Sequence, residues 1–195
     1  MNMEVIKDKY SRALKVVLIG DGGTGKTSLV NQFVHKSFNT IYKTTIGVDI
    51  TPYLVAETKD PKKTIRFVLW DMSGQSHFER FRTRFYAGTS GALVVYDLTS
   101  ANSYRNVERW INELYSKCKD VPIVIAGNKA DISELQIKHS RPPTLEHSHL
   151  TTSAKTNQNV EKAFFTLFEK IANKELTMTD SQDSKTTHVS YESEV

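Results

Sequence analysis

The chain has 195 residues, of which 38% are hydrophobic and 25% charged, and its net charge is +4 at pH 7. This composition predicts one soluble globular domain with a core of its own, and the mild, unclustered charge does not indicate a nucleic-acid partner. No apolar run approaches the roughly 20 residues that cross a bilayer, and the first residues show neither a signal peptide nor a myristoylation glycine, so an intracellular protein is expected. The single cysteine, Cys118, excludes an internal disulfide and a zinc site built from cysteines.

Short apolar runs alternate with helical patterns along the chain, which predicts an α/β fold with a mostly parallel sheet. The expected strands are Leu14–Ile19, Val48–Val55, Ile65–Trp70, Ala92–Tyr96, Ile123–Ala126 and a short piece near Leu150. A polar, proline-containing loop that is too short for a helix joins the second and third strands, so we expect a hairpin and one antiparallel edge strand. Apolar residues at helical spacing predict helices in the segments Leu29–Phe33, Tyr104–Leu114 and Val160–Ile171.

The same pattern divides the chain into three parts. We expect an N-terminal extension over residues 1–12, a single domain over 13–175 and a disordered, acidic tail rich in Ser and Thr over 176–195. Pro142 and Pro143 interrupt the segment between Asp131 and Ser153. A shortened helix near Thr144–His147, or an irregular loop, is therefore expected there.

The first strand is followed at once by the phosphate-loop pattern G-x-x-x-x-G-K-[ST], formed by Gly20, Asp21, Gly22, Gly23, Thr24, Gly25, Lys26 and Thr27. Its glycines let backbone N–H groups point at phosphate oxygens, and the helix that begins beside Ser28 presents its positive end to the same charge. Lys26 is expected to neutralise the β- and γ-phosphates, and Thr27 to offer its hydroxyl to Mg²⁺. The pattern predicts a nucleoside triphosphate site, and the alternative is a glycine-rich turn without a ligand.

A second cluster lies where the third strand ends, at Asp71, Gly74 and Gln75. An aspartate in this place is suited to hold the Mg²⁺ shell, usually through water, and Gly74 allows a backbone amide to reach the γ-phosphate. Gln75 would lie beside that phosphate, where its carboxamide can orient an attacking water. Taken alone, the same residues also fit an ordinary turn.

A third cluster, Asn128-Lys129-Ala130-Asp131, follows the fifth strand at the sheet edge where ligands gather. The Asp131 carboxylate can accept from both N1–H and the amino group of guanine, whereas adenine has no such pair of donors, so guanine is favoured. Lys129 would pack its stem along the base, and Asn128 would tie this loop to the phosphate loop. A solvated polar loop is the alternative interpretation.

A final segment after the last short strand completes the expected base pocket, and it consists of Ser153, Ala154 and Lys155. The backbone N–H of Ala154 is expected to bond guanine O6.

With these motifs in order, the chain resembles the Rab-like branch of the Ras superfamily of small GTPases from about Leu14 to Ile171. The resemblance implies a three-layer P-loop NTPase (small G-protein) fold with a mostly parallel six-stranded sheet and one antiparallel edge strand. It implies that Phe38 stacks on the base and that Tyr42 closes over the phosphates. Thr45 would bind Mg²⁺ through its hydroxyl and the γ-phosphate through its N–H.

The resemblance further implies a monomeric GTP hydrolase that binds GTP or GDP with Mg²⁺ and acts as a molecular switch in trafficking or signalling. Exchange factors, GTPase-activating proteins and effectors would read its two switch regions. The second switch carries an aromatic and basic mixture suited to an interface, although some of its rings would fit a core equally well: Phe78, Arg80, Phe81, Arg82, Arg84, Phe85 and Tyr86. No arginine stands where a catalytic finger would act in cis, so slow intrinsic turnover is expected.

Several positions depart from the family pattern. Met72-Ser73 stands where Thr-Ala is usual, Ser76-His77 where Glu-Arg is common, and Ile50 where Rab-like chains carry an aromatic residue. No prenylation cysteine lies near the C-terminal residue Val195, so we expect no direct lipid anchor and a cytoplasmic protein that reaches membranes through partners. Two other functions stay open: a GTP-binding scaffold without hydrolysis, and a P-loop kinase for a small acceptor, which would leave Asn128–Asp131 unexplained.

Overall fold

The computed structural model describes residues 10–40, 43–56, 64–134, 137 and 147–183. Its centre is a six-stranded sheet in the order β2-β3-β1-β4-β5-β6. The strands are β1 (Tyr10–Ile19), β2 (Val48–Ala56), β3 (Thr64–Met72), β4 (Thr89–Asp97), β5 (Ile123–Asn128) and β6 (Ser148–Thr151). Only β2 runs antiparallel to its neighbour, so the predicted mostly parallel sheet with one antiparallel edge strand is confirmed.

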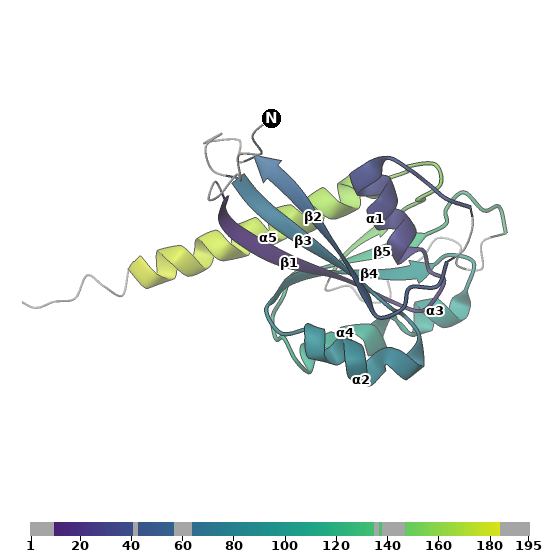
Figure 1. Ribbon diagram of the computed structural model, residues 1–195, viewed down its shortest axis with the longest axis horizontal. Helices are drawn as coiled ribbons and strands as arrows, with labels where there is room; N and C mark the ends of the chain where they lie inside the picture. Colours follow the sequence, from purple (N-terminus) through teal and green to yellow (C-terminus); the bar gives the residue numbers. More distant parts are fainter. Residues whose placement is uncertain (1–9, 41–42, 57–63, 135–136, 138–146, 184–195) are drawn as a thin grey trace, which may run out of the picture.

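Helices cover both faces of this sheet (Figure 1). They are α1 (Lys26–His35), α2 (Glu79–Arg82), α3 (Ala101–Arg105), α4 (Val107–Tyr115) and α5 (Val160–Asp183), and 3-10 turns at Ser76–Phe78 and Thr83–Phe85 flank α2. Figure 1 shows α1 and α5 on one face, and α2 and α4 on the other. The result is the three-layer arrangement that the sequence predicts. The short helix α2 was not predicted, because no apolar periodicity indicates it.

The central strand β1 shows why both faces are covered. Val16 and Leu18 belong to the core beneath α1 and α5, whereas Val17 and Ile19 belong to the core beneath α4. Successive side chains of a strand point to opposite faces, so a strand buried on both sides is a continuous apolar run.

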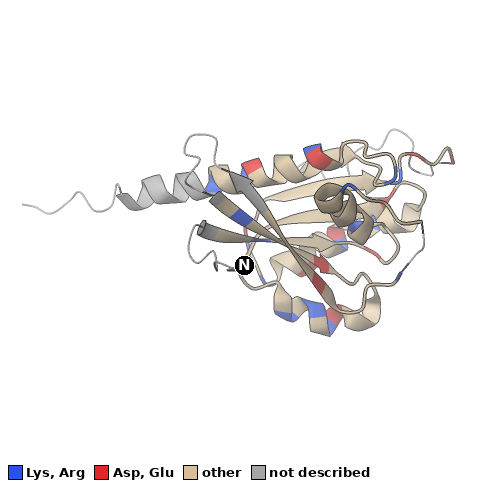
Figure 2. Cartoon of the chain, turned by 45° about the horizontal axis from the view of Figure 1, so that its top comes forward, with Lys and Arg blue, Asp and Glu red and all other residues tan. Residues whose placement is uncertain are grey.

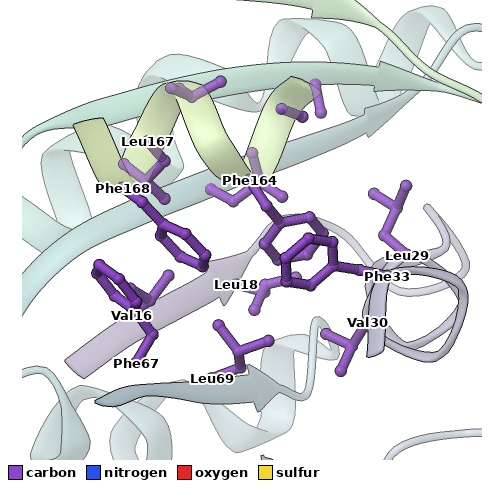
Figure 3. Close-up of a cluster of buried hydrophobic side chains, with 14 of the residues drawn as sticks. Val16, Leu18, Leu29, Val30, Phe33, Phe67, Leu69, Phe164, Leu167 and Phe168 are labelled. Atoms are coloured by element: carbon purple, nitrogen blue, oxygen red, sulfur yellow. The ribbon is translucent and has the colours of Figure 1, made fainter. Parts of the chain in front are cut away.

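Stacked aromatic rings join α5 to α1 and to the sheet (Figure 3). The ring centres of Phe33 and Phe164 are 4.1 Å apart, and those of Phe67 and Phe168 are 3.7 Å apart. These contacts fix α1 to α5 and α5 to the sheet, and with them the loop that joins β1 to α1.

The C-terminal helix is longer than the sequence indicates. α5 has 24 residues and runs to Asp183, so residues 176–183 are helical, whereas disorder is expected from residue 176 onward. This segment contains neither glycine nor proline, the residues that end a helix most effectively, so nothing local stops it. At the other terminus β1 already begins at Tyr10, inside the expected extension, and residues 144–146 of the helix expected near Thr144–His147 lie outside the described residues.

In the cartoon of Figure 2, short segments of Lys and Arg and of Asp and Glu are interspersed along the helices and strands. Within the ranges that the structure describes, no helix combines the length and the apolar character needed to span a membrane.

Candidate nucleotide-binding site

A cavity of about 570 Å³ opens at the edge of the sheet where β1, β3 and β5 end, a size typical of small-ligand sites. Most of the residues that the sequence singles out line it, namely Gly22, Gly23, Gly25, Lys26, Thr27, Ser28, Phe38, Thr45, Gly74, Gln75, Asn128, Lys129, Asp131, Ala154 and Lys155. Tyr42 lies outside the described residues. The remaining candidates, Asp21, Thr24, Asp71 and Ser153, form hydrogen bonds behind the lining.

Two glycines are required by the close approach of the loops. Gly25 has a φ of 92°, and a Cβ added to it would lie 2.3 Å from Nδ2 of Asn128. A Cβ on Gly74 would lie 2.3 Å from the carbonyl oxygen of Gly20. Any side chain at either position would therefore separate the phosphate loop from the loop facing it.

Lys26 is held inside the phosphate loop. Its Nζ donates to the carbonyl oxygens of Gly20 and Asp21, each at 2.8 Å, and only 6% of the residue is exposed. Burial lowers the pKa of Lys26 to about 8, and the nearby carboxylates of Asp71 and Asp21 partly oppose this shift. The Lys26 amino group is thus held in place, and an anion that enters the cavity would favour its charged form.

Three oxygen-bearing side chains meet beside Lys26. The Thr27 hydroxyl donates to Oδ2 of Asp71, and the hydroxyl oxygens of Thr27 and Thr45 are 2.9 Å apart. The Thr45 hydroxyl also reaches Oδ2 of Asp71, at 3.4 Å, whereas Oδ1 of this buried carboxylate has no hydrogen-bond partner. Burial raises the pKa of Asp71, and the two hydroxyl bonds and Lys26 act in the other direction. Hydroxyl and carboxylate oxygens are ligands that suit Mg²⁺, so these residues fit the expected metal.

The departures at Met72 and Ser73 have separate places in the structure. Met72 is fully buried in the core beneath α4. Ser73 lines the cavity, is 1% exposed, and its Oγ has no hydrogen-bond partner. An unpartnered buried hydroxyl costs free energy, which a polar ligand in the cavity would recover.

On the base side, Asn128 connects three loops. Its Nδ2 donates to the carbonyl oxygen of Thr24 at 2.9 Å, as the sequence predicts for a tie to the phosphate loop. Its Oδ1 accepts from the backbone N–H of Ala154 at 3.2 Å and from the Thr152 hydroxyl at 3.3 Å. The Ala154 N–H therefore faces Asn128 here, an intraprotein partner that sequence reasoning missed.

The Asp131 carboxylate is oriented by two neighbours. The Ser153 hydroxyl donates to Oδ1 at 2.6 Å, and the Lys155 ammonium lies 3.7 Å from Oδ2. Lys129 has a φ of 68° and places its ammonium 2.6 Å from Oδ2 of Asp97, at the end of β4. No motif indicated Asp97, and its only signal is its place at the carboxyl end of a buried strand.

The side chain of Asp21 does not point into the cavity. Its carboxylate accepts from Nδ2 of Asn106 at 2.7 Å and from Nε1 of Trp110 at 2.8 Å, and Arg109 lies 3.2 Å from it. Only the Asp21 backbone, which accepts from Lys26 and from the Thr24 hydroxyl, belongs to the phosphate loop. Any contact of Asp21 with a ligand would therefore have to come from its main chain.

The second switch divides between core and surface. Arg82 and Tyr86 are fully buried, whereas Phe81 is 44% exposed. Ile50 is 49% exposed and pairs in register with Trp70 across β2 and β3. The result is an exposed apolar area beside the switch, although two of the candidate interface residues are core.

Comparison with known proteins agrees with this geometry. The model of the Ras family matches residues 15–173. The Ras-related protein Rab-10 of Diplobatis ommata is 35% identical over 174 residues, which cover 86% of this chain and 86% of that protein. The chain therefore belongs to the Ras family and is a Rab-like small GTPase, a GTP hydrolase with the P-loop fold.

Proposed function

We propose that this GTPase binds GTP and GDP with Mg²⁺, hydrolyses GTP slowly to GDP and phosphate, and uses the two nucleotide states as a switch. One observation supports this most directly. Asn128 joins the phosphate loop to the base-side loops by hydrogen bonds to Thr24 and Ala154, so the expected phosphate and base contacts face one cavity.

Guanine specificity is assigned to Asp131 and Ala154. Ser153 and Lys155 hold the Asp131 carboxylate at the cavity wall, where it can accept two hydrogen bonds from guanine. The Ala154 N–H would turn from Asn128 to guanine O6 or be shared between them, and Phe38, which lines the cavity, would stack on the base. Adenine offers no such pair of donors to this carboxylate, which favours guanine.

Thr27, Thr45 and Asp71 are the residues that would hold Mg²⁺. The bound ion would neutralise charge on the β- and γ-phosphates during transfer to water. Lys26 adds a positive charge beside these residues, and its depressed pKa makes an anion a favourable partner.

Gln75 is the proposed catalytic residue because its side chain lines the cavity beside the phosphate loop. A Cβ added to Gly22 would lie 3.8 Å from Cγ of Gln75, so the two residues share the space for an attacking water. The buried Arg82 is already committed to protein partners and does not serve as a catalytic finger. Intrinsic turnover is therefore slow, and a GTPase-activating protein would raise it by roughly 10³- to 10⁵-fold.

Partners would read the two switches at an apolar area formed by the exposed Ile50 and Phe81 and the partly buried Trp70 and Phe85. The ring centre of Phe85 lies 4.9 Å from that of Phe81 and 5.9 Å from that of Trp70, so this area is continuous from β3 to the second switch. Thr45 and Gly74 would hold both switches while the γ-phosphate is present. From its Rab-like family we assign the protein to trafficking in the cytoplasm, at membranes reached through exchange factors and effectors.

The test begins with purified protein that is boiled, so that the released nucleotide can be identified by chromatography. Phosphate release from added GTP and Mg²⁺ is then followed for the wild type and for Gln75→Leu. Guanine nucleotide and a slow release that Gln75→Leu abolishes are expected. Adenine nucleotide would contradict the specificity, and bound GTP without turnover in the wild type would favour a scaffold.

A further inference from the structure

We propose that Arg82 is a positioning residue for hydrolysis, held by Glu113 so that it fixes the backbone of Gln75. We call the contacts of Arg82 with Glu113 and Gln75 the Arg82 clamp. The inference rests on the proposed role of Gln75 in hydrolysis and adds a residue that lies outside the nucleotide motifs.

The first part of the clamp is a buried, two-pronged ion pair. Nε of Arg82 donates to Oε1 of Glu113, and Nη2 donates to Oε2, both at 2.7 Å. The Arg82 side chain is 0% exposed and that of Glu113 10% exposed, and the Tyr86 hydroxyl adds a bond of 2.7 Å to Oε1. Two parallel bonds fix the plane of the guanidinium as well as its position.

The second part is the remaining arm of the guanidinium. Nη1 of Arg82 donates to the carbonyl oxygen of Gln75 at 2.9 Å, and the same oxygen accepts from the Phe78 N–H at 3.1 Å. Gln75 precedes a 3-10 turn of three residues, and no side chain caps that turn. So short a turn has little stability of its own, and its geometry depends on such outside contacts.

The clamp also connects to the phosphate loop. The guanidinium carbon of Arg82 lies 4.2 Å from the ring centre of Trp110, a cation–π contact. Nε1 of Trp110 in turn donates to Asp21 at 2.8 Å. The backbone of Gln75 is thus held relative to the loop that binds the phosphates, which is the relation that water attack requires.

Burial of the pair does not itself explain its presence. Apolar residues of similar volume often replace a buried ion pair without loss of stability. An apolar pair cannot donate to the Gln75 carbonyl, however. Stability and hydrolysis should therefore separate when both charges are removed together.

The experiment compares Arg82→Met, Glu113→Leu and the double variant with the wild type. Each single variant leaves one buried charge unpaired and lowers the melting temperature, and the double variant recovers most of that loss. For the double variant we expect single-turnover hydrolysis at saturating GTP to fall by roughly 10- to 100-fold, with GTP and GDP affinities within about twofold of the wild type. A recovered melting temperature together with wild-type hydrolysis would show that the clamp has a structural role only.

Two further variants and one exchange measurement make the test decisive. Tyr86→Phe removes one bond to Glu113 but leaves Arg82 on Gln75, so it should lower stability and not turnover. If the double variant does not fold, Arg82→Lys keeps the buried charge without the planar fork, and unchanged hydrolysis there would refute the proposal. Amide hydrogen exchange at Phe78 in the GDP-bound protein should accelerate in each folded clamp variant. This readout decides whether the clamp orders the turn even if the wild type does not hydrolyse GTP, and unchanged exchange would count against it.

Discussion

Replacing Asn128 by alanine tests whether the loops around the cavity depend on one another. The variant removes a donor to the Thr24 carbonyl at 2.9 Å, and an acceptor for the Ala154 N–H at 3.2 Å and the Thr152 hydroxyl at 3.3 Å. Asn128 is 2% exposed, so water cannot readily replace these bonds. Each bond contributes roughly 1 kcal/mol net, which gives about 3 kcal/mol in the free energy of unfolding.

Urea unfolding of the nucleotide-free protein measures this loss, because bound GDP would stabilise each variant by an amount that depends on that variant's own affinity. The dissociation rate of a fluorescent GDP, measured on the same preparations, should rise because the phosphate and base loops are no longer joined. Thr152→Val is the matched control. It removes one of the three bonds, together with a long contact of the same hydroxyl to the Gly127 carbonyl oxygen at 3.4 Å, so about 1 kcal/mol is expected.

The reasoning fails if Asn128→Ala loses less than the Thr152→Val control and releases GDP at the wild-type rate. That result would mean that the loops hold their positions without the asparagine.

Three other changes have expected outcomes that follow from single contacts. Gly22→Val should keep GDP affinity but suppress phosphate release, because a Cβ at Gly22 already lies 3.8 Å from Cγ of Gln75, and wild-type release would contradict the proposed site for the attacking water. Ser73→Ala removes a buried hydroxyl without a partner, so the melting temperature of the nucleotide-free protein should rise by an amount that corresponds to about 1 kcal/mol, and a decrease would show that the hydroxyl is satisfied. Burial lowers the pKa of His149 from 6.5, so the folded state favours the neutral ring, and stability should fall as the pH drops below 6.5. His149→Gln should weaken that dependence in urea unfolding at pH 7.5 and 5.5, and an identical pH profile would exclude His149 as its source.

Patterns confined to neighbouring residues were sufficient to predict most of the fold. The run Leu14–Ile19 is apolar at every position except Lys15, because Val16 and Val17 face different cores, and this identified a strand covered on both sides. The phosphate-loop glycines likewise follow from local backbone geometry, since only a residue without a Cβ at position 25 leaves room for Asn128. Most of the cavity lining was also among the residues predicted from motifs. Seven further lining residues were not among the candidates, namely Asn31, Asn39, Thr40, Lys43, Thr44, Ser73 and Ile132.

Contacts between distant residues could not be predicted in this way. The Asp21 carboxylate accepts hydrogen bonds from Asn106 and Trp110, which lie 85 and 89 residues away in the sequence. Nothing in the phosphate-loop pattern indicates these two contacts. Arg82 bonds to Glu113, which is 31 residues away in the sequence, although both are residue types that are usually exposed. Where a charged side chain becomes buried depends on packing between elements, which a single sequence does not reveal.

The placement of Trp110 gives this protein an internal optical reporter. The chain has two tryptophans, and both border the second switch: Trp110 lies under Arg82, and Trp70 lies near Phe85. Indole emission depends on nearby charges and on hydration, so a movement of the switch alters the light emitted by either ring. Exchange of one nucleotide for another should therefore be visible in the unlabelled protein, and replacing Trp70 by phenylalanine would assign the signal to the indole that bonds the phosphate loop.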